Sequence, residues 1–236
     1  DPVRYRLLET TRTYALERLA EHNEVVRCSQ RHAHAVRDLF VHTDEERFGE
    51  GGTLALDSLM QRLGPELDNW RAAFDWAVGA GAQPALAIAL AGAGALVLDH
   101  IGLAQEALDR MLPLRSLVKD DIAAPQAAAF WLRLATLGTS GRLPRDALLD
   151  AQARGLRLCR TLGSRRLLHT GLCTAAWSLN MVGESAAAEA MLQEIADLER
   201  SGDPAWLRCT RLNLQAAICH HQSRFEESAC LLEQQQ

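Results

Sequence analysis

The sequence predicts an all-α fold, and three observations support this prediction. Alanine and leucine dominate a chain of 236 residues, of which 48 % are hydrophobic and 23 % are charged. Runs of β-branched and aromatic residues, which are typical of strands, are almost absent. A helical unit also recurs with a period of about 40 residues through the second half of the chain. The apolar fraction is ample for the core of one large domain or two modest ones.

The first segment, residues 1–43, is predicted to hold one short strand and two helices. Residues 3–7 alternate between apolar and basic side chains, which is typical of a strand. A lone strand leaves its backbone groups unpaired, so we expect it to fray or to pair with another molecule. Helices are predicted over residues 9–22, with Asn23 as the C-terminal cap, and over about residues 24–42.

A linker and a junction are predicted next. Residues 44–52 hold four acids and three glycines without an apolar period, which predicts a linker. Residues 53–81 are predicted as junction helices, a short one and then one whose apolar residues recur at spacings of three and four. These residues are Leu67, Trp70, Phe74, Ala77 and Val78. Gly79 and Gly81 are expected to end this helix in a left-handed turn. Because Trp76 points to a different side from Trp70, we expect neighbours on both sides of the helix.

Residues 82–236 are predicted to form tetratricopeptide-like helix hairpins stacked in a right-handed superhelix. Each unit is a helix, a turn at Gly or Ser, and a second helix with a small residue about five positions later. The turn residues are Gly102, Gly141, Gly183 and Ser223, which stand 39, 42 and 40 residues apart. This spacing exceeds the ~34 residues of a standard tetratricopeptide unit, so each helix should be longer by about a turn. Four helix pairs follow, over residues 83–118, 125–162, 164–200 and 204–236. The last pair stops in mid-helix, and we expect the sequence to be part of a longer protein.

Charge argues against nucleic-acid or nucleotide binding by this chain itself. The formal net charge is −5, so there is no global basic field for DNA or RNA. Arg154, Arg157 and Arg160 have the spacing of one solvated helix face. Lys119 is the only lysine and has no glycine near it, whereas a phosphate-binding loop needs lysine after a glycine-rich turn. We therefore expect no ATP binding and no cofactor.

The cysteines and histidines are the candidate metal ligands and nucleophiles of this chain. Six cysteines stand at irregular spacings with no CxxC pair, and there is no secretory or membrane-spanning segment, which predicts reduced thiols in a cytoplasmic protein. One Cys/His group is His22, Cys28, His32 and His34, and a second is Cys209, Cys219, His220 and His221. Neither supplies four converging ligands, as a structural zinc site requires. The sequence predicts no metal site, no catalytic residue and no enzyme.

Two stretches resemble a known family. The segment RYRLLETTRTYALERLAEHNE (Arg4–Glu24), followed by Arg31-His32, resembles the end of the winged-helix domain in bacterial STAND-class regulators, which carry an NB-ARC-like ATPase. ELDNWRAAFDWAVGAG (Glu66–Gly81) and the repeats after it resemble the segment that follows in those proteins. The chain departs from the family at Trp70, where leucine is more usual, and at Gln222-Ser223, where Gly-Asp is usual.

The resemblance implies a longer chain whose domains have different functions. An ATPase domain would precede the winged helix, and an OmpR-type or LuxR-type DNA-binding domain would lie at one end. The repeats would then sense an effector or bind a partner protein. The partners implied are a protein or small effector in the repeat groove and the rest of the regulator chain. DNA would be bound only through a missing domain, and no membrane is involved.

The function that follows is a non-catalytic sensor or protein-interaction module. In stacked hairpins the first helix of each pair lines the concave face, so helical spacing predicts which residues bind a partner. These residues are Trp131, Thr139, Thr170, Trp177, Asn180, Thr210, Asn213 and His220. Two alternatives stay open. The tryptophans could instead belong to the core between repeats, and the domain could be an enzyme or bind a small molecule in a groove pocket. A closed apolar pocket with converging polar groups would favour the small molecule, and an open groove would favour a protein.

Overall fold

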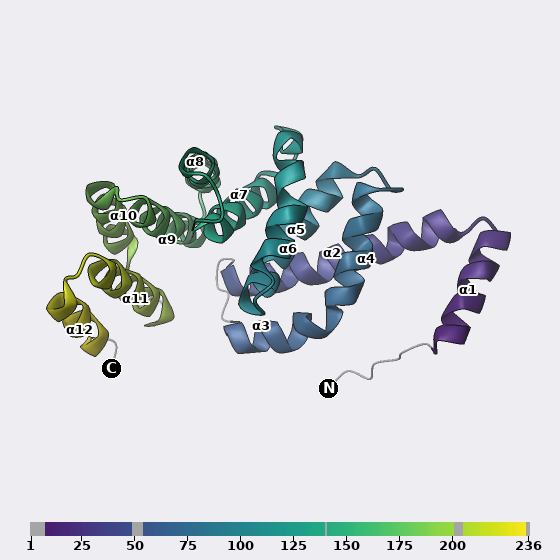
Figure 1. Cartoon of the computed structure of the whole chain (residues 1–236), viewed down its shortest axis with the longest axis horizontal. Coiled ribbons are helices and arrows are strands. Elements are labelled where there is room, and N and C mark those ends of the chain that lie inside the picture. Colours follow the sequence, from purple (N-terminus) through teal and green to yellow (C-terminus); the bar gives the residue numbers. More distant parts are fainter. Residues whose placement is uncertain (1–7, 49–53, 140, 201–204, 235–236) are drawn as a thin grey trace.

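The computed structural model describes residues 8–48, 54–139, 141–200 and 205–234, and these residues are helical with no strand among them. Figure 1 shows the helices spread along the long axis of the molecule, with α1 and α12 at opposite ends. The predicted all-α class is confirmed. The strand predicted over residues 3–7 lies outside the described residues.

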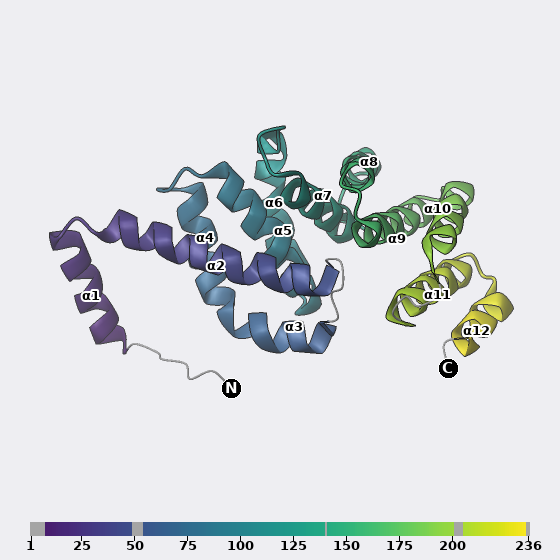
Figure 2. The same ribbon diagram turned by 180° about the vertical axis from the view of Figure 1, so that it is seen from behind.

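The described residues of the N-terminal third form four α-helices and one 3-10 turn. They are α1 (Glu9–Glu21), α2 (Val25–Phe48), α3 (Leu56–Leu63), η1 (Gly64–Glu66) and α4 (Leu67–Val78). α1 has no buried side chain and projects away from the other helices in Figure 1. It ends at Glu21, and Asn23, two residues later, has the positive φ of 57° of the left-handed cap that the sequence predicts. The long helix α2 packs across α4 and α5, as Figure 2 shows from behind.

α2 runs further than the sequence predicts, because residues 44–48 of the predicted linker belong to it. Two of the acids in the predicted linker, Asp44 and Glu46, interact with arginines of other helices. Asp44 accepts a hydrogen bond from Arg133 on α7 at 2.9 Å, and Glu46 pairs with Arg62 on α3 at 2.6 Å. Ion pairs to remote partners stabilise the helical conformation that the local composition disfavours. Residues 49–53 lie outside the described residues.

α4 packs against both α2 and α5. Trp70 is 1 % exposed, and its indole Nε1 donates a hydrogen bond to the Leu90 carbonyl of α5 at 2.9 Å. Its ring stacks on Phe74 with 5.6 Å between centroids and lies 6.4 Å from Phe40 of α2. The indole also lies directly against Gly94 of α5, where a Cβ would overlap the ring. Trp70 therefore joins three helices.

Two details of the α4 prediction are wrong. Val78 is 52 % exposed, because the buried stripe of α4 is centred on Trp70 and Ala77, and Val78 lies at its edge. Neither Gly79 nor Gly81 is left-handed, and the residue with positive φ is Ala82, at 44°. Gly81 serves a different purpose, since a Cβ there would lie 2.8 Å from the ring of Trp76. Because Gly81 has no Cβ, the backbone of the turn can lie against the Trp76 ring.

The second half of the chain consists of four consecutive helix pairs. They are α5 (Pro84–His100) with α6 (Ala104–Met111), α7 (Ala124–Gly138) with α8 (Arg145–Thr161), α9 (Arg165–Met181) with α10 (Ser185–Leu198), and α11 (Ala205–His221) with α12 (Phe225–Glu233). A 3-10 segment, η2 (Leu112–Leu117), follows α6. The two helices of each pair pack together, and the first helices pack in succession from α5 through α7 and α9 to α11. The helix pairs predicted from the spacing are confirmed within a few residues.

The turn residues explain why the pairs form where they do. Gly102, Gly141 and Gly183 have φ values of 82°, 77° and 82°, a left-handed conformation that glycine adopts without steric cost. The small residue that follows is buried in three pairs, as Ala107, Ala188 and Ser228. In the α7–α8 pair six residues separate the helices, three more than in each other pair, and α8 begins four residues after Gly141. Leu148 therefore takes the buried position, and Ala147 is only half-buried.

Ser223 takes the left-handed position in the last turn, with a φ of 63°. We expect Ser223→Gly to raise the free energy of unfolding by about 0.5 kcal/mol. The substitution removes a left-handed strain of about 1 kcal/mol but adds some chain entropy to the unfolded state. Ser58→Gly is the matched control, because Ser58 lies exposed in α3 and glycine there should destabilise by about 1 kcal/mol. Thermal unfolding of both variants checks the opposite signs, and a loss of stability in Ser223→Gly would contradict the assignment.

Candidate functional site

Three of the predicted partner-binding residues do not face a groove. Trp131 is 3 % exposed and packs edge-on against Phe130 at 5.5 Å, with the Arg154 guanidinium of α8 5.0 Å from its ring centroid. It therefore belongs to the core, which is the alternative left open by the sequence. Thr139 is buried at the end of α7, where its hydroxyl donates to the Thr136 carbonyl at 2.7 Å. The longer α7–α8 turn shifts the helical count, so spacing from Gly141 selects the wrong face of α7.

Asn180 is the third buried residue, at 2 % exposure. Its amide oxygen accepts a hydrogen bond of 3.4 Å from Gln222 in the turn between α11 and α12. This contact joins the last two hairpins. Asn180 therefore belongs to the packing between repeats, and its prediction as a partner-binding residue is wrong.

Three other predicted residues, Trp177, Asn213 and His220, line one pocket. We call it the groove pocket, and it has a volume of about 410 Å³ between α9, α11 and α12. Its lining residues are Trp177, Asn213, Ala216, Ala217, His220, His221, Ser228 and Leu232. The Trp177 ring is half-buried, whereas Asn213 and His220 are exposed. Local spacing explains this arrangement, because positions 213, 216, 217, 220 and 221 share one face of α11.

The chemistry of the groove pocket is mainly apolar with a few polar groups at its edge. Ala216 and Ala217 of α11 line the pocket with small side chains, which leave space open. Leu232, which also lines it, is 48 % exposed. His220 is held edge-on against Phe225 with 5.2 Å between centroids, which fixes the imidazole at the rim. The two remaining predicted residues, Thr170 and Thr210, do not line the pocket. Thr170 is half-buried on α9, and Thr210 is exposed on α11 one turn before Asn213.

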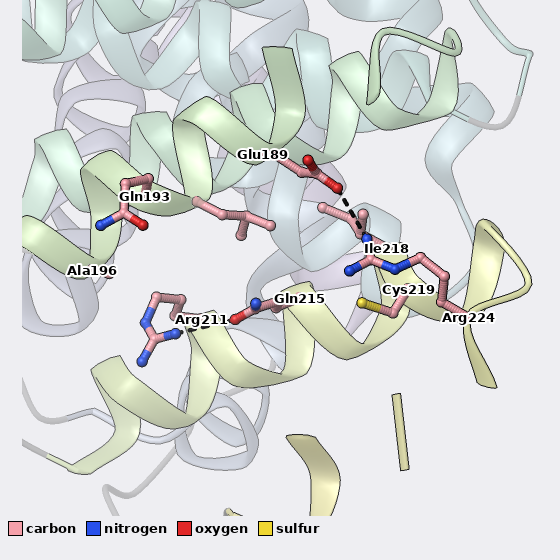
Figure 3. Close-up of a pocket in the computed structure, with 9 residues that line it drawn as sticks. Glu189, Gln193, Ala196, Arg211, Gln215, Ile218, Cys219 and Arg224 are labelled. Atoms are coloured by element: carbon pink, nitrogen blue, oxygen red, sulfur yellow. Dashed lines mark hydrogen bonds and ion pairs between the residues drawn. The ribbon is translucent and has the colours of Figure 1, made fainter. Parts of the chain in front are cut away.

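A second cleft of about 260 Å³ lies between α10 and α11, and Figure 3 shows its lining. Arg211 of α11 donates two hydrogen bonds to Glu199, at 2.7 and 3.2 Å, and a third to Gln215 at 3.2 Å. At the other end, Arg224 reaches back to Glu189 of α10 at 3.0 Å and also pairs with Glu227. Each guanidinium is balanced by carboxylates, so the cleft is an ion-paired boundary between hairpins.

Spacing along one helix did not identify these arginines. Arg211 and Gln215 are four apart, which places them on one face, but the carboxylates lie on other segments of the chain. The pKa of Glu227 is lowered, chiefly by the hydrogen bond from Arg224. That pair is local, three residues apart, whereas the pairs of Arg211 with Glu199 and of Arg224 with Glu189 cannot be deduced without the three-dimensional arrangement.

The buried cysteines are poor nucleophiles. Burial raises the pKa of Cys159 to about 11 and that of Cys173 to about 12. Burial is also the main cause that raises the pKa of Cys219, which borders the cleft in Figure 3. A thiol with a raised pKa holds almost no thiolate at neutral pH, and thiolate is the reactive form.

Labelling with iodoacetamide at pH 7.5 should follow this order. Cys230 is exposed and should react first, whereas Cys159 and Cys173 should stay unmodified in the folded protein. Peptide mass spectrometry after timed labelling gives the measurement, and labelling in 8 M urea is the control that should modify every cysteine. Modification of Cys159 as fast as Cys230 under native conditions would contradict the structure.

The described residues contain no group of three or more His, Cys, Asp or Glu side chains placed to hold a metal ion. No described helix is both long enough and apolar enough to cross a membrane. Comparison with known proteins found no matching family model, no matching curated protein and no matching solved structure.

Proposed function

We propose that this chain is the sensor or protein-interaction part of a bacterial, cytoplasmic transcriptional regulator of the STAND class. In this proposal residues 1–43 are the end of a winged-helix domain, and residues 82–236 continue as a right-handed tetratricopeptide-like superhelix. Support comes from the resemblance at Arg4–Glu24 and Glu66–Gly81, and from the four helix pairs with their stacked first helices. ATP and DNA would be handled by other parts of the regulator.

The observation that carries the proposal is the convergence of Trp177, Asn213 and His220 on the groove pocket. These side chains come from the first helices of successive pairs, the arrangement by which repeat proteins build binding surfaces. A half-buried tryptophan beside an exposed amide suits an extended peptide with an apolar side chain. The indole ring would supply contact area, and the amide would bond to the peptide backbone.

A peptide selection tests this function. Peptides from a random phage-displayed library would be selected on the purified chain and their affinities measured by fluorescence polarisation. We expect Trp177→Ala to weaken the selected peptides at least tenfold, because interface tryptophans carry about 2 kcal/mol or more. His220→Ala should weaken them by a smaller factor.

Trp76→Ala is the matched control, since Trp76 is also a half-buried tryptophan but lies on α4, which does not line the groove pocket. It should leave peptide affinity unchanged. Selected peptides that bind Trp177→Ala and His220→Ala as tightly as the unaltered chain would place the interaction elsewhere and contradict the proposal.

A further inference from the structure

A separate pocket of about 380 Å³ lies where the C-terminal part of α2 meets the first helices α5, α7 and α9. Small side chains create the space: Ala89 and Ala93 of α5 and Ala129 of α7 line it. None of the residues that line the groove pocket takes part. A volume of this size accommodates a small organic molecule and is too small for a folded partner.

The lining is mainly apolar with a few polar groups, among them Ser164 at the start of α9. Asp44 and Glu45 of α2 and the amide of Gln126 border the pocket, and most of the other lining residues are apolar. The Asp44 carboxylate already accepts a hydrogen bond from Arg133 at 2.9 Å. The Glu45 side chain is exposed and has no hydrogen bond or ion pair to any other residue that the structure describes.

The two neighbouring arginines, Arg133 and Arg47, already have hydrogen-bond partners in the protein. Arg133 binds Asp44, and Arg47 donates to the Leu54 carbonyl at 2.9 Å. Neither arginine lines the pocket, whereas both carboxylates do. A ligand that enters therefore meets an apolar wall and two negative charges, one of which lacks a cation.

We propose that this pocket binds a small organic cation, a protonated amine carried on a compact apolar body. The amine would pair with Glu45 and approach Asp44, and the apolar body would lie against the alanines of α5 and α7. The ligand would contact α2 as well as three helices of the repeats. It would thereby link the N-terminal helices to the repeats, independently of any peptide in the groove pocket.

Phenethylamine is a suitable probe, with 2-phenylethanol as its uncharged counterpart of nearly equal size. Both would be titrated into the ¹⁵N-labelled chain and followed by amide chemical shifts. A probe of this size should bind in the millimolar range. We expect the amine to bind about threefold more tightly than the alcohol, the ratio that an ion pair with an exposed carboxylate provides. Equal binding of the two would overturn the proposal.

Two neighbouring glutamates make a matched pair of variants. Glu45→Gln should weaken phenethylamine about threefold, whereas Glu46→Gln should not, because Glu46 pairs with Arg62 and does not line the pocket. Equal effects of the two variants would contradict the site. Ala129→Leu should abolish binding by filling the pocket, with circular dichroism to verify folding. If that variant fails to fold, the glutamate pair still decides. Trp177→Ala should leave the amine affinity unchanged, so this test stands apart from the peptide selection.

Discussion

Replacing Trp70 by alanine should lower the free energy of unfolding by about 3–5 kcal/mol, the largest single-residue effect we expect in this chain. The indole is 1 % exposed and packs between Phe40 of α2 and Phe74 of α4. Alanine leaves a cavity among three helices and also removes the indole hydrogen bond to the Leu90 carbonyl. Urea denaturation followed by far-ultraviolet circular dichroism measures the loss.

Two further variants locate this effect at the junction. Gly94→Ala places a Cβ where the Trp70 indole lies, so we expect a loss of about 1–3 kcal/mol from overpacking. Trp76→Ala is the control on the same helix, and its half-buried ring should cost less than half as much as Trp70. If Trp70→Ala and Trp76→Ala cost the same, Trp70 does not join the three helices.

Glu106→Gln should cost about 1–2 kcal/mol at neutral pH. The Glu106 carboxylate on α6 accepts two hydrogen bonds from Arg71 of α4, at 2.8 and 2.9 Å, and one from Arg110 at 3.3 Å. Arg110 also pairs with Asp75, and its guanidinium lies 5.4 Å from the centroid of the Trp70 ring. The network therefore fastens α4 to α6 over the buried junction, and its partial exposure keeps the effect below that of a fully buried pair.

The effect of Glu106 depends on pH in a definite direction. Its pKa in the folded protein is lowered from the ordinary value of 4.5, first of all by the hydrogen bonds from Arg71. A carboxylate with a lowered folded pKa stabilises the protein above the unfolded pKa, and this stabilisation is lost as pH falls through the folded pKa. The difference in stability between the unaltered chain and Glu106→Gln should thus be full at pH 7 and shrink steadily below pH 4.5.

Melting temperatures measured from pH 7 to pH 3 test this direction. Asp68→Asn is the control, because Asp68 also bonds to Arg71, at 3.0 Å, but its side chain is 97 % exposed. Its effect should be within about 0.5 kcal/mol at every pH. A Glu106→Gln difference that stays constant down to pH 3 would show that the carboxylate charge is not the source of the stabilisation.

Local signals were sufficient to predict the helix pairs. Glycine at Gly102, Gly141 and Gly183 marks a left-handed turn whose geometry depends on neighbouring residues only. The end of α2 could not be predicted in this way. Asp44 and Glu46 are paired with Arg133 and Arg62, which lie 89 and 16 residues further along the chain. From composition alone, a run of acids and glycines predicts a linker.

The candidate site was predictable only in part, for a related reason. Helical spacing brought Trp177, Asn213 and His220 together correctly, because α9 and α11 keep regular phase from their turns. The same count failed for Trp131, because α7 ends three residues before Gly141, whereas α9 and α11 end two residues before Gly183 and Ser223, so the count selects a rotated face of α7. The pocket bordered by Glu45 gave no local signal, because its walls come from four helices.

Hydrogen–deuterium exchange with a display-selected peptide tests the central claim, that the first helices of the last two pairs form the binding surface. The account predicts slower exchange in α9, α11 and α12 when the peptide is bound, with α8 and α10 unchanged. Peptide-bound Trp177→Ala, at the same peptide concentration, should lose most of this protection. Protection confined to α8 and α10, or to α2 and α5, would contradict the account.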